Sequence, residues 1–380
     1  ITGNKATKGD GGVINMAGGT VTISGAKLTG NTSSRYGGAV YLYNGVTATM
    51  TGGEISSNQA ASEGGAVHVF GTSTFNLSGG KITGNSSVDG GAIYLNREPS
   101  VLNMTGGVIS GNTATGNGGI YIFRTRSICN LSGGMIEENT AGGSGGGIYV
   151  NPSNSGQLKL SGAPVVRNNT VSGAANNVYL PSGKTLTISA PMELGASIGV
   201  TTGNTSYPVA FSGAYDTNYE AYFASDDASV GAEYNTADKK LYLVVPQYGV
   251  TIVVEGNGTA EAAPINAPAG TEITLTAAPA EGYHFNGWIV NRPDVRIYQN
   301  KFTMPAGNVA IKAIFEAHSF TQEVAEEQYL ATPADCNNDA VYYKSCSCGA
   351  AGTETFTKAG TALGHDFGAW TQNSDGATHT

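Results

Sequence analysis

The sequence predicts an all-β chain: a right-handed parallel β-helix with about 27 residues per coil over residues 1–246, followed by small β-rich modules. The main observation is a phrase of the form aliphatic-x-x-Asn that returns at a fixed interval. No segment has the apolar spacing of an amphipathic helix, which excludes a helical repeat. The phrase begins at Ile1, Leu28, Ile55, Ile82, Ile109 and Ile136, always 27 residues apart, and again at Val166 after a step of 30.

Two further phrases keep nearly the same interval, so each unit contains three short alternating segments. Strands this short are stable only if every unit forms one coil and pairs with the coils above and below it, about 4.8 Å away. Crossover chirality favours the right-handed form. One phrase ("FNLSGG" and its variants) begins at Ala48, Phe75, Leu102 and Cys129, and the other ("VYL", "IYV" and similar) begins at Val40, Val67, Ile93, Ile120, Ile148 and Val178.

Alternation along each strand predicts which side chains are buried. Phe75 and Leu77 should point into the coil and Asn76 outward, and Cys129 falls in the inward position as a small buried hydrophobe. Paired glycines permit corners that a β-carbon would block. The asparagines of the first phrase tolerate turn conformations and can stack as amide ladders; they are Asn4, Asn31, Asn58, Asn85, Asn112, Asn139 and Asn169.

The central residue of the third segment is nearly always aromatic and is predicted to point outward. If the register holds, these residues form one exposed stripe with a rung about every 4.8 Å. One interpretation is structural, because stacked aromatic side chains stabilise neighbouring strands. The other is a ligand-binding platform, since tyrosines offer flat apolar faces and a hydroxyl to sugars or proteins. The stripe consists of Tyr41, His68, Tyr94, Tyr121, Tyr149 and Tyr179.

Parallel β-helices also carry polysaccharide lyases and hydrolases, so an enzyme is the alternative hypothesis. Such chemistry needs clustered carboxylates, usually beside a basic residue. The acidic residues of the first 160 positions instead look scattered over different units and turns, so we expect no enzyme activity and no cofactor. They are Asp10, Glu54, Glu63, Asp89, Glu98, Glu137 and Glu138.

The pattern changes after the repeats, and the changes predict the domain boundaries. Residues 201–246 are predicted to form terminal coils and a cap, which covers the open edge of the last coil. Alternating strands with Phe285, Trp288, Phe302 and Phe315 as a small core indicate a module over residues 247–317. A short cysteine-containing repeat follows over residues 318–364, and residues 365–380 begin a second copy, because "HDF" at His365 echoes "HSF" at His318.

Three cysteines of the short repeat, Cys336, Cys346 and Cys348, allow two arrangements. In an exported chain they could form one disulfide with a leftover thiol. They could also join His318 or His365 in a zinc site. The disulfide or free-thiol arrangement is favoured, since no Cys-x-x-Cys pair is present.

Several phrases resemble known families. "GGA[IV]" alternating with "[IF]xxN" resembles the repeats of chlamydial polymorphic outer-membrane proteins and, more broadly, of right-handed β-helix adhesin-like surface proteins of bacteria. "EGYHFNGW" from Glu281 and "FTMPAGNVAIKAIF" from Phe302 resemble divergent internalin B-repeat modules of Gram-positive surface proteins, which are mostly stalk units. The cysteine-containing repeat is similar to repeats of large clostridial surface proteins.

These resemblances imply an adhesin-like protein exported to the bacterial cell surface. Its expected partner is a host glycan, a host surface protein, or another copy of itself. The net charge of −9 argues against nucleic acid, and no stretch approaches the length of a membrane span. The chain starts and stops in mid-phrase, so we expect a fragment whose signal peptide and cell-wall anchor lie outside it.

Overall fold

The computed structural model describes residues 1–97, 99–153, 156–365, 371–373 and 376–378. The chain divides into two compact units, Ile1–Pro246 and Gln247–Thr380. Among the described residues, helical structure is limited to two short 3₁₀ turns, and no helix is long and apolar enough to cross a membrane. Glu98 lies outside the described part of the chain. So do residues 366–370, 374–375 and 379–380 of the predicted second cysteine-containing copy.

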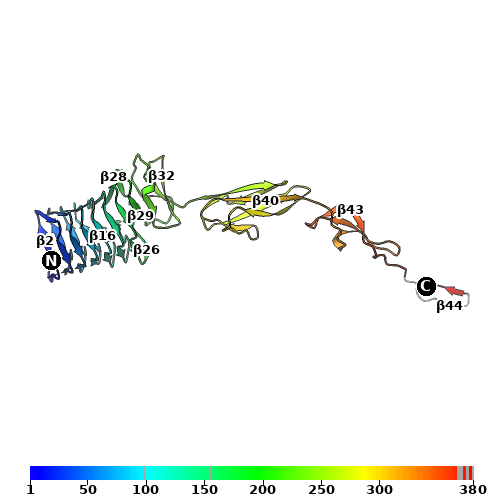
Figure 1. Cartoon of the computed structure of the whole chain (residues 1–380), viewed down its shortest axis with the longest axis horizontal. Coiled ribbons are helices and arrows are strands. Elements are labelled where there is room, and N and C mark those ends of the chain that lie inside the picture. The colour runs from blue at the N-terminus through cyan, green and yellow to red at the C-terminus, as the bar shows by residue number, and fades with distance from the viewer. Residues whose placement is uncertain (98, 154–155, 366–370, 374–375, 379–380) are drawn as a thin grey trace. The chain divides into compact units, whose positions relative to one another are not determined.

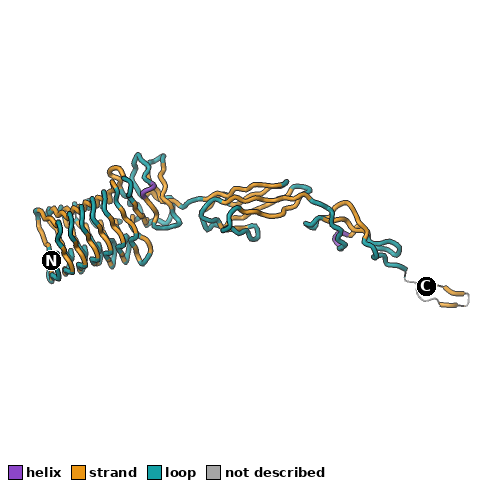
Figure 2. The backbone as a smooth tube through the Cα atoms, in the orientation of Figure 1, coloured by secondary structure: helices purple, strands orange, loops and turns teal. Residues whose placement is uncertain are grey.

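The first unit is a parallel β-helix, as predicted, and its stacked coils are visible from β2 onward (Figures 1 and 2). Each coil contributes four strands rather than the three expected. The additional strand has only two residues, directly after the asparagine of the first phrase, and is too short to show an alternating pattern. Its members are β1 (Lys5–Ala6), β5 (Thr32–Ser33), β9 (Gln59–Ala60), β13 (Ser86–Ser87), β17 (Thr113–Ala114), β21 (Thr140–Ala141) and β25 (Thr170–Val171), to which β26 (Ala174–Ala175) pairs antiparallel.

The other three strands of each coil stack into three longer parallel faces. The first face holds β2 (Ile14–Ala17), β6 (Val40–Tyr43), β10 (Val67–Phe70), β14 (Ile93–Asn96), β18 (Ile120–Ile122), β22 (Ile148–Val150) and β27 (Val178–Leu180). The second holds β3 (Thr20–Ile23), β7 (Thr47–Met50), β11 (Thr74–Leu77), β15 (Val101–Met104), β19 (Ile128–Leu131), β23 (Gln157–Gly162) and β28 (Thr187–Met192). The third holds β4 (Lys27–Thr29), β8 (Glu54–Ser56), β12 (Lys81–Thr83), β16 (Val108–Ser110), β20 (Met135–Glu137) and β24 (Val165–Arg167), and β29 (Ser197–Thr202) pairs with both β24 and β27.

The interior of the coils is the aliphatic core that the sequence predicts. Phe75, Leu77 and Ile82 are fully buried, whereas Asn76 is partly exposed on the outside. Burying one such side chain contributes about 1.5–3 kcal/mol to stability. Cys129 is also fully buried, and this burial raises the pKa of its thiol to about 12. It is therefore a core residue rather than a reactive thiol.

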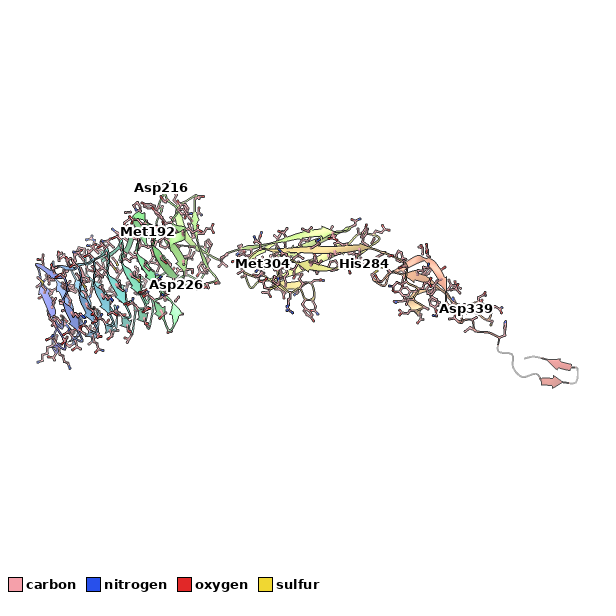
Figure 3. All side chains as sticks on the ribbon, viewed as in Figure 1. Met192, Asp216, Asp226, His284, Met304 and Asp339 are labelled. Carbon is pink, nitrogen blue, oxygen red and sulfur yellow. The ribbon has the colours of Figure 1, made fainter. Side chains whose placement is uncertain are left out.

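The asparagines of the repeat form a continuous ladder through the interior, which we call the asparagine ladder. Each side-chain Oδ1 accepts hydrogen bonds from the backbone N–H and the Nδ2 of the previous member; Asn85, for example, donates to Asn112 Oδ1 at 3.0 and 2.9 Å. The predicted amide stacking is thus confirmed. The ladder comprises Asn4, Asn31, Asn58, Asn85, Asn112, Asn139, Asn169 and Asn177 and ends on Asp226, which Figure 3 labels.

The C-terminal end of the β-helix is closed by a small antiparallel sheet, and the predicted cap thus has its own secondary structure. Phe211 and Leu241 of this region are buried in the same core as the coils. A cap is needed because the last coil would otherwise expose apolar side chains and unpaired strand edges. Its elements are β30 (Val209–Ala210), η1 (Glu220–Tyr222), β31 (Phe223–Ser225), β32 (Gly231–Asn235) and β33 (Lys240–Val244).

The second unit contains two small sheets followed by a three-stranded sheet. Phe302 and Phe315 are buried as predicted, whereas Phe285 and Trp288 are only partly buried. The four-stranded sheet has the order β36 (Asn266–Ala267), β34 (Tyr248–Glu255), β40 (Val309–Ala317), β38 (Tyr283–Val290), and the three-stranded sheet beside it β35 (Gly258–Ala263), β37 (Glu272–Pro279), β39 (Lys301–Thr303). Next come η2 (Glu327–Tyr329), the sheet of β41 (Leu330–Thr332), β42 (Val341–Ser345) and β43 (Ala351–Thr357), and the pair β44 (Thr371–Asn373) and β45 (Gly376–Thr378).

The asparagine ladder leads to a stability prediction. Replacing Asn112 with alanine leaves the buried N–H groups of Asn85 and the carbonyl of Ile82 without their partner. Unsatisfied buried polar groups are expensive, so Asn112→Ala should lower the free energy of unfolding by about 3 kcal/mol or more in chemical denaturation. The matched control is Asn103→Ala, whose amide bonds only to Asn76 and Asn130 at the partly exposed surface and should cost about 1 kcal/mol or less. Equal losses would contradict a special role for the interior ladder.

Candidate functional site on the outer face of the β6–β27 sheet

The aromatic residues of the third sequence phrase occupy one row on the outer face of the first sheet, as the predicted register requires. His68 pairs with Tyr41 on one side and Tyr94 on the other, and Tyr121, Tyr149 and Tyr179 follow in register. Adjacent rings are in contact, with centroids 4.8 to 5.7 Å apart. We call these six residues the aromatic row. Contacts of this kind stabilise neighbouring coils.

The expectation that this row is exposed is wrong for four of its six members. Tyr41 is 9% exposed, His68 0%, Tyr94 2% and Tyr121 5%, whereas Tyr149 and Tyr179 are half-buried. Because four members are covered, only the C-terminal end of the row offers ring surface to a ligand.

Side chains on both sides of the row cover it. The strand alternates, so the outward residue two positions later can lie beside a ring: Tyr43 is 5.3 Å from Tyr41, and Phe123 is 5.6 Å from Tyr121 between ring centroids. Phe123 also lies 5.7 Å from Tyr94 in the preceding coil. On the other side, Tyr36 lies 6.1 Å from Tyr41. Alternation alone says which way a side chain points, but not whether its neighbours cover it.

The residues that cover the row on the side of Tyr36 form a column that the sequence analysis missed. Each stands directly before a Gly-Gly pair, and the backbone N–H after each one bonds to the carbonyl of the next. Asp10, Glu63 and Asp89, which were expected to be scattered, therefore lie on one edge of the sheet. The repeated acid or amide before Gly-Gly could have revealed this. We call it the Gly-Gly column: Asp10, Tyr36, Glu63, Asp89, Asn117 and Ser144.

The glycines explain why this column is fixed in place. Gly64 has φ of +68°, a conformation that β-carbons disfavour. At Gly65, a β-carbon would lie 2.1 Å from the carbonyl oxygen of Gly91 in the next coil. Only glycine permits so close an approach between coils, so the residue before each pair is held beside the aromatic row.

Glu63 is the most perturbed acid of the column. Burial raises the pKa of its carboxyl to about 7, with the neighbouring charge of Asp89 as a second cause, while a hydrogen bond from Asn96 and the charge of Arg124 oppose the shift. Asp89 is held by different partners, since its Oδ1 accepts from the backbone N–H of Asn117 at 2.7 Å. The two adjacent carboxyls therefore have different environments, an arrangement typical of acid–base pairs.

His68 lies against Glu63 without forming a hydrogen bond to it. Its Nε2 is 3.8 Å from Glu63 Oε2, and both ring nitrogens and that oxygen are buried without a hydrogen-bond partner among the described residues. Complete burial lowers the pKa of His68 to about 3, so the imidazole is neutral. The neutral ring therefore provides no positive charge to stabilise the ionised form of Glu63.

The perturbed carboxyl of Glu63 leads to a pH prediction. Because its folded-state pKa lies above the ordinary value of 4.5, folding favours the protonated form. Stability should therefore fall as the pH rises from about 4.5 to about 7, and Glu63→Gln should be more stable than the wild type by about 1–3 kcal/mol at pH 8 but not at pH 4.

Chemical denaturation at both pH values measures this difference. The matched control is Glu54→Gln, which removes only a surface ion pair with Lys27 and should change stability by less than about 0.5 kcal/mol at either pH. A Glu63→Gln variant less stable than the wild type at pH 8 would show that the carboxylate is stabilised there instead.

Comparison with known proteins agrees with this architecture. Residues 248–319 match the family described as divergent InlB B-repeat domain, so the second unit begins with an internalin-like module. No curated protein and no solved structure matches the chain. Residues 1–211, more than half of the chain, match the model of the right-handed β-helix region. The chain therefore belongs to the right-handed β-helix family.

Proposed function

We propose that this chain is part of an adhesin-like protein exported to the bacterial cell surface, in which the β-helix binds a glycan and the internalin-like module belongs to a stalk. The combination of a β-helix with an internalin-like repeat supports this proposal, because neighbouring coils and modules extend a chain without forming a single large core. The net charge of −9 disfavours nucleic acid as a partner.

The binding surface of this proposal is the C-terminal end of the aromatic row. Tyr149 and Tyr179 are the two members left half-buried, and their rings stack with centroids 5.7 Å apart and planes 13° apart. Asn151, two positions after Tyr149, is buried and donates to the Tyr121 hydroxyl at 2.6 Å. Flat aromatic faces that carry hydroxyls suit a sugar ring, which has both apolar faces and polar edges.

The buried part of the row supports the exposed part. Tyr94 and Tyr121 are covered and pack edge to face, so the neighbouring Tyr149 is held by contacts on one side before any ligand binds. A surface that is already ordered loses less conformational entropy on binding. The observation that carries the proposal is this change from covered to half-exposed aromatic side chains along one row.

Paired substitutions separate binding from structure. The double variant Tyr149→Ser, Tyr179→Ser should lose glycan binding by at least about tenfold, measured on a glycan array and by affinity retention, because the flat faces are removed. Its melting temperature should change little. The matched control, Tyr94→Ser, removes a covered ring and should lower the free energy of unfolding by about 3 kcal/mol.

Other outcomes would replace the proposed ligand. Glycan binding equal to the wild type in the double variant would contradict the proposed surface. Binding to a host surface protein, or concentration-dependent self-association lost in the same variant, would keep the surface but identify a different partner.

A polysaccharide-acting enzyme is the second candidate, and one observation favours it. Glu63 and Asp89 are adjacent carboxyls whose environments differ, and glycoside cleavage uses a pair of carboxyls. Turnover of an anionic or neutral polysaccharide that disappears in Glu63→Gln, but persists in Glu54→Gln, would support this function over simple binding.

A further inference from the structure

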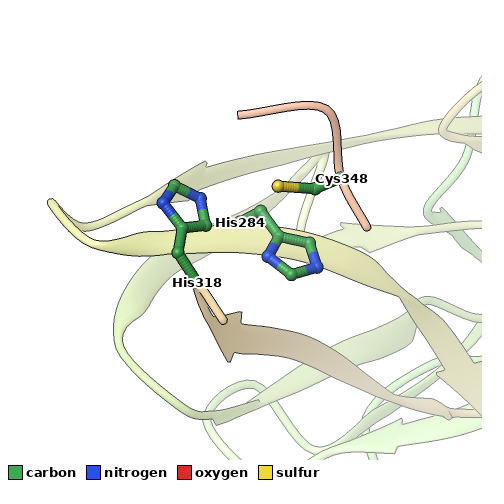
Figure 4. A group of neighbouring side chains, drawn as sticks. All are labelled: His284, His318 and Cys348. Atoms are coloured by element: carbon green, nitrogen blue, oxygen red, sulfur yellow. The ribbon is translucent and has the colours of Figure 1, made fainter. Parts of the chain in front are cut away.

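We propose that His284, His318, Cys346 and Cys348 form a zinc site in the second unit. His284 lies on β38, His318 directly follows β40, and both cysteines lie in the turn between β42 and β43. Figure 4 shows the two imidazoles and the Cys348 sulfur gathered around one space. Two imidazoles and two thiolates are a frequent ligand set of structural zinc.

The distances fit a metal with a small adjustment. The ligand atoms of His284, His318 and Cys348 all lie within 4.8 Å of one another. A tetrahedral Zn²⁺, with bonds of about 2.0–2.3 Å, holds its ligand atoms roughly 3.3–3.8 Å apart. Side-chain rotations that move these atoms by about 1 Å would therefore complete the geometry. The two imidazole rings are already nearly parallel, with centroids 5.5 Å apart.

An unsatisfied atom also points to a ligand. Nδ1 of His284 is buried and has no hydrogen-bond partner among the described residues. A buried ring nitrogen normally has a partner, because leaving it unpaired costs about 1–3 kcal/mol. Coordination to a metal would satisfy it.

Cys346 lies outside this three-residue group but beside it, and we assign it as the fourth ligand. Its side chain is 4% exposed, and its thiol is hydrogen-bonded to the thiol of Cys348 and to the backbone N–H of Ser319, the neighbour of His318. It therefore lies next to the three residues already grouped. With Cys346 included, all four positions of a tetrahedral site are filled by protein, which is typical of a structural rather than a catalytic metal.

This ligand set differs from the one that the sequence suggested. All four cysteines of the chain are free thiols in this structure, which is the free-thiol form of the arrangement that the sequence favours. Cys336 is exposed and lies outside the group, and His365 is 3.1 Å from the side chain of Asn337 instead. His284 has no sequence signature as a ligand, because it belongs to the preceding module and lies 62 positions before Cys346.

The zinc ion would connect two parts of the second unit. It would join the β38–β40 sheet of the internalin-like module to the β42–β43 hairpin of the cysteine-containing repeat. Metal binding that requires the folded arrangement adds its free energy to the stability of that arrangement. The site would thus stabilise a short repeat that buries few residues of its own.

Cobalt substitution in the full chain tests the proposal. The chain is reduced, freed of metal with a chelator and titrated with Co²⁺, then with Zn²⁺ in competition. We expect one ion per chain, the intense visible bands of tetrahedral cobalt, a thiolate-to-cobalt charge-transfer band, and displacement of cobalt by zinc. Cys348→Ser and His318→Gln should weaken binding at least tenfold, and Cys346→Ser should reduce the charge-transfer band by about half.

The controls use residues of the same types that lie outside the group. Cys336→Ser and His365→Gln should bind cobalt like the wild type, and thermal unfolding without metal checks that each variant folds. Absence of a tetrahedral spectrum in the reduced wild type would overturn the proposal. Binding that is unchanged in Cys348→Ser, or that requires Cys336 and His365, would also overturn it.

Discussion

The in-register stacking of one coil on the next is the constraint on which the rest of the β-helix depends. After 27 residues the chain reaches the equivalent position in the next coil. Ile82 therefore pairs with Ile55 and Ile109 and stays inside the core. A shift of one residue would turn every inward side chain outward. The asparagine ladder fixes this register further, because each interior amide can reach only the member directly above or below it.

The same constraint explains why the outer faces carry rows rather than isolated residues. When coils are in register, a residue type favoured at one position recurs along the whole sheet, and contacts between rows replace contacts within a coil. The aromatic row and the Gly-Gly column arise in this way. Their proximity places the buried imidazole of His68 beside Glu63, five positions earlier in the chain and on the other side of the Gly-Gly corner.

Much of the fold could be predicted from the sequence because the constant repeat interval determines which residues pair between neighbouring coils. The inward positions of Phe75 and Ile82, the buried Cys129 and the stacked asparagines all follow from alternation and a constant interval. The candidate site was predicted only in part. Alternation assigns Tyr94 to the outer face, but its burial depends on Phe123 of the next coil, and this contact between coils has no local sequence signature.

The second unit shows a different limit. Cys346 and Cys348 stand close together in the sequence, yet their nearest histidines come from β38 and from the residue after β40. Such a group is assembled by antiparallel pairing and turns, whose lengths vary, and no periodic interval predicts it. The β-helix could be predicted from its repeat, whereas this cluster becomes evident only in the three-dimensional structure.

Amide hydrogen exchange resolved to individual coils tests the central claim, which is that stacked coils in register hold the β-helix together. In chain 1–380, the strands of the middle coils, β11 to β16, should be the most protected and exchange together. Protection should decrease coil by coil toward β1–β4, the first coil of chain 1–380. Exchange of β12 or β16 at the rate of exposed loops, or protection that follows single sheets rather than coils, would contradict the account.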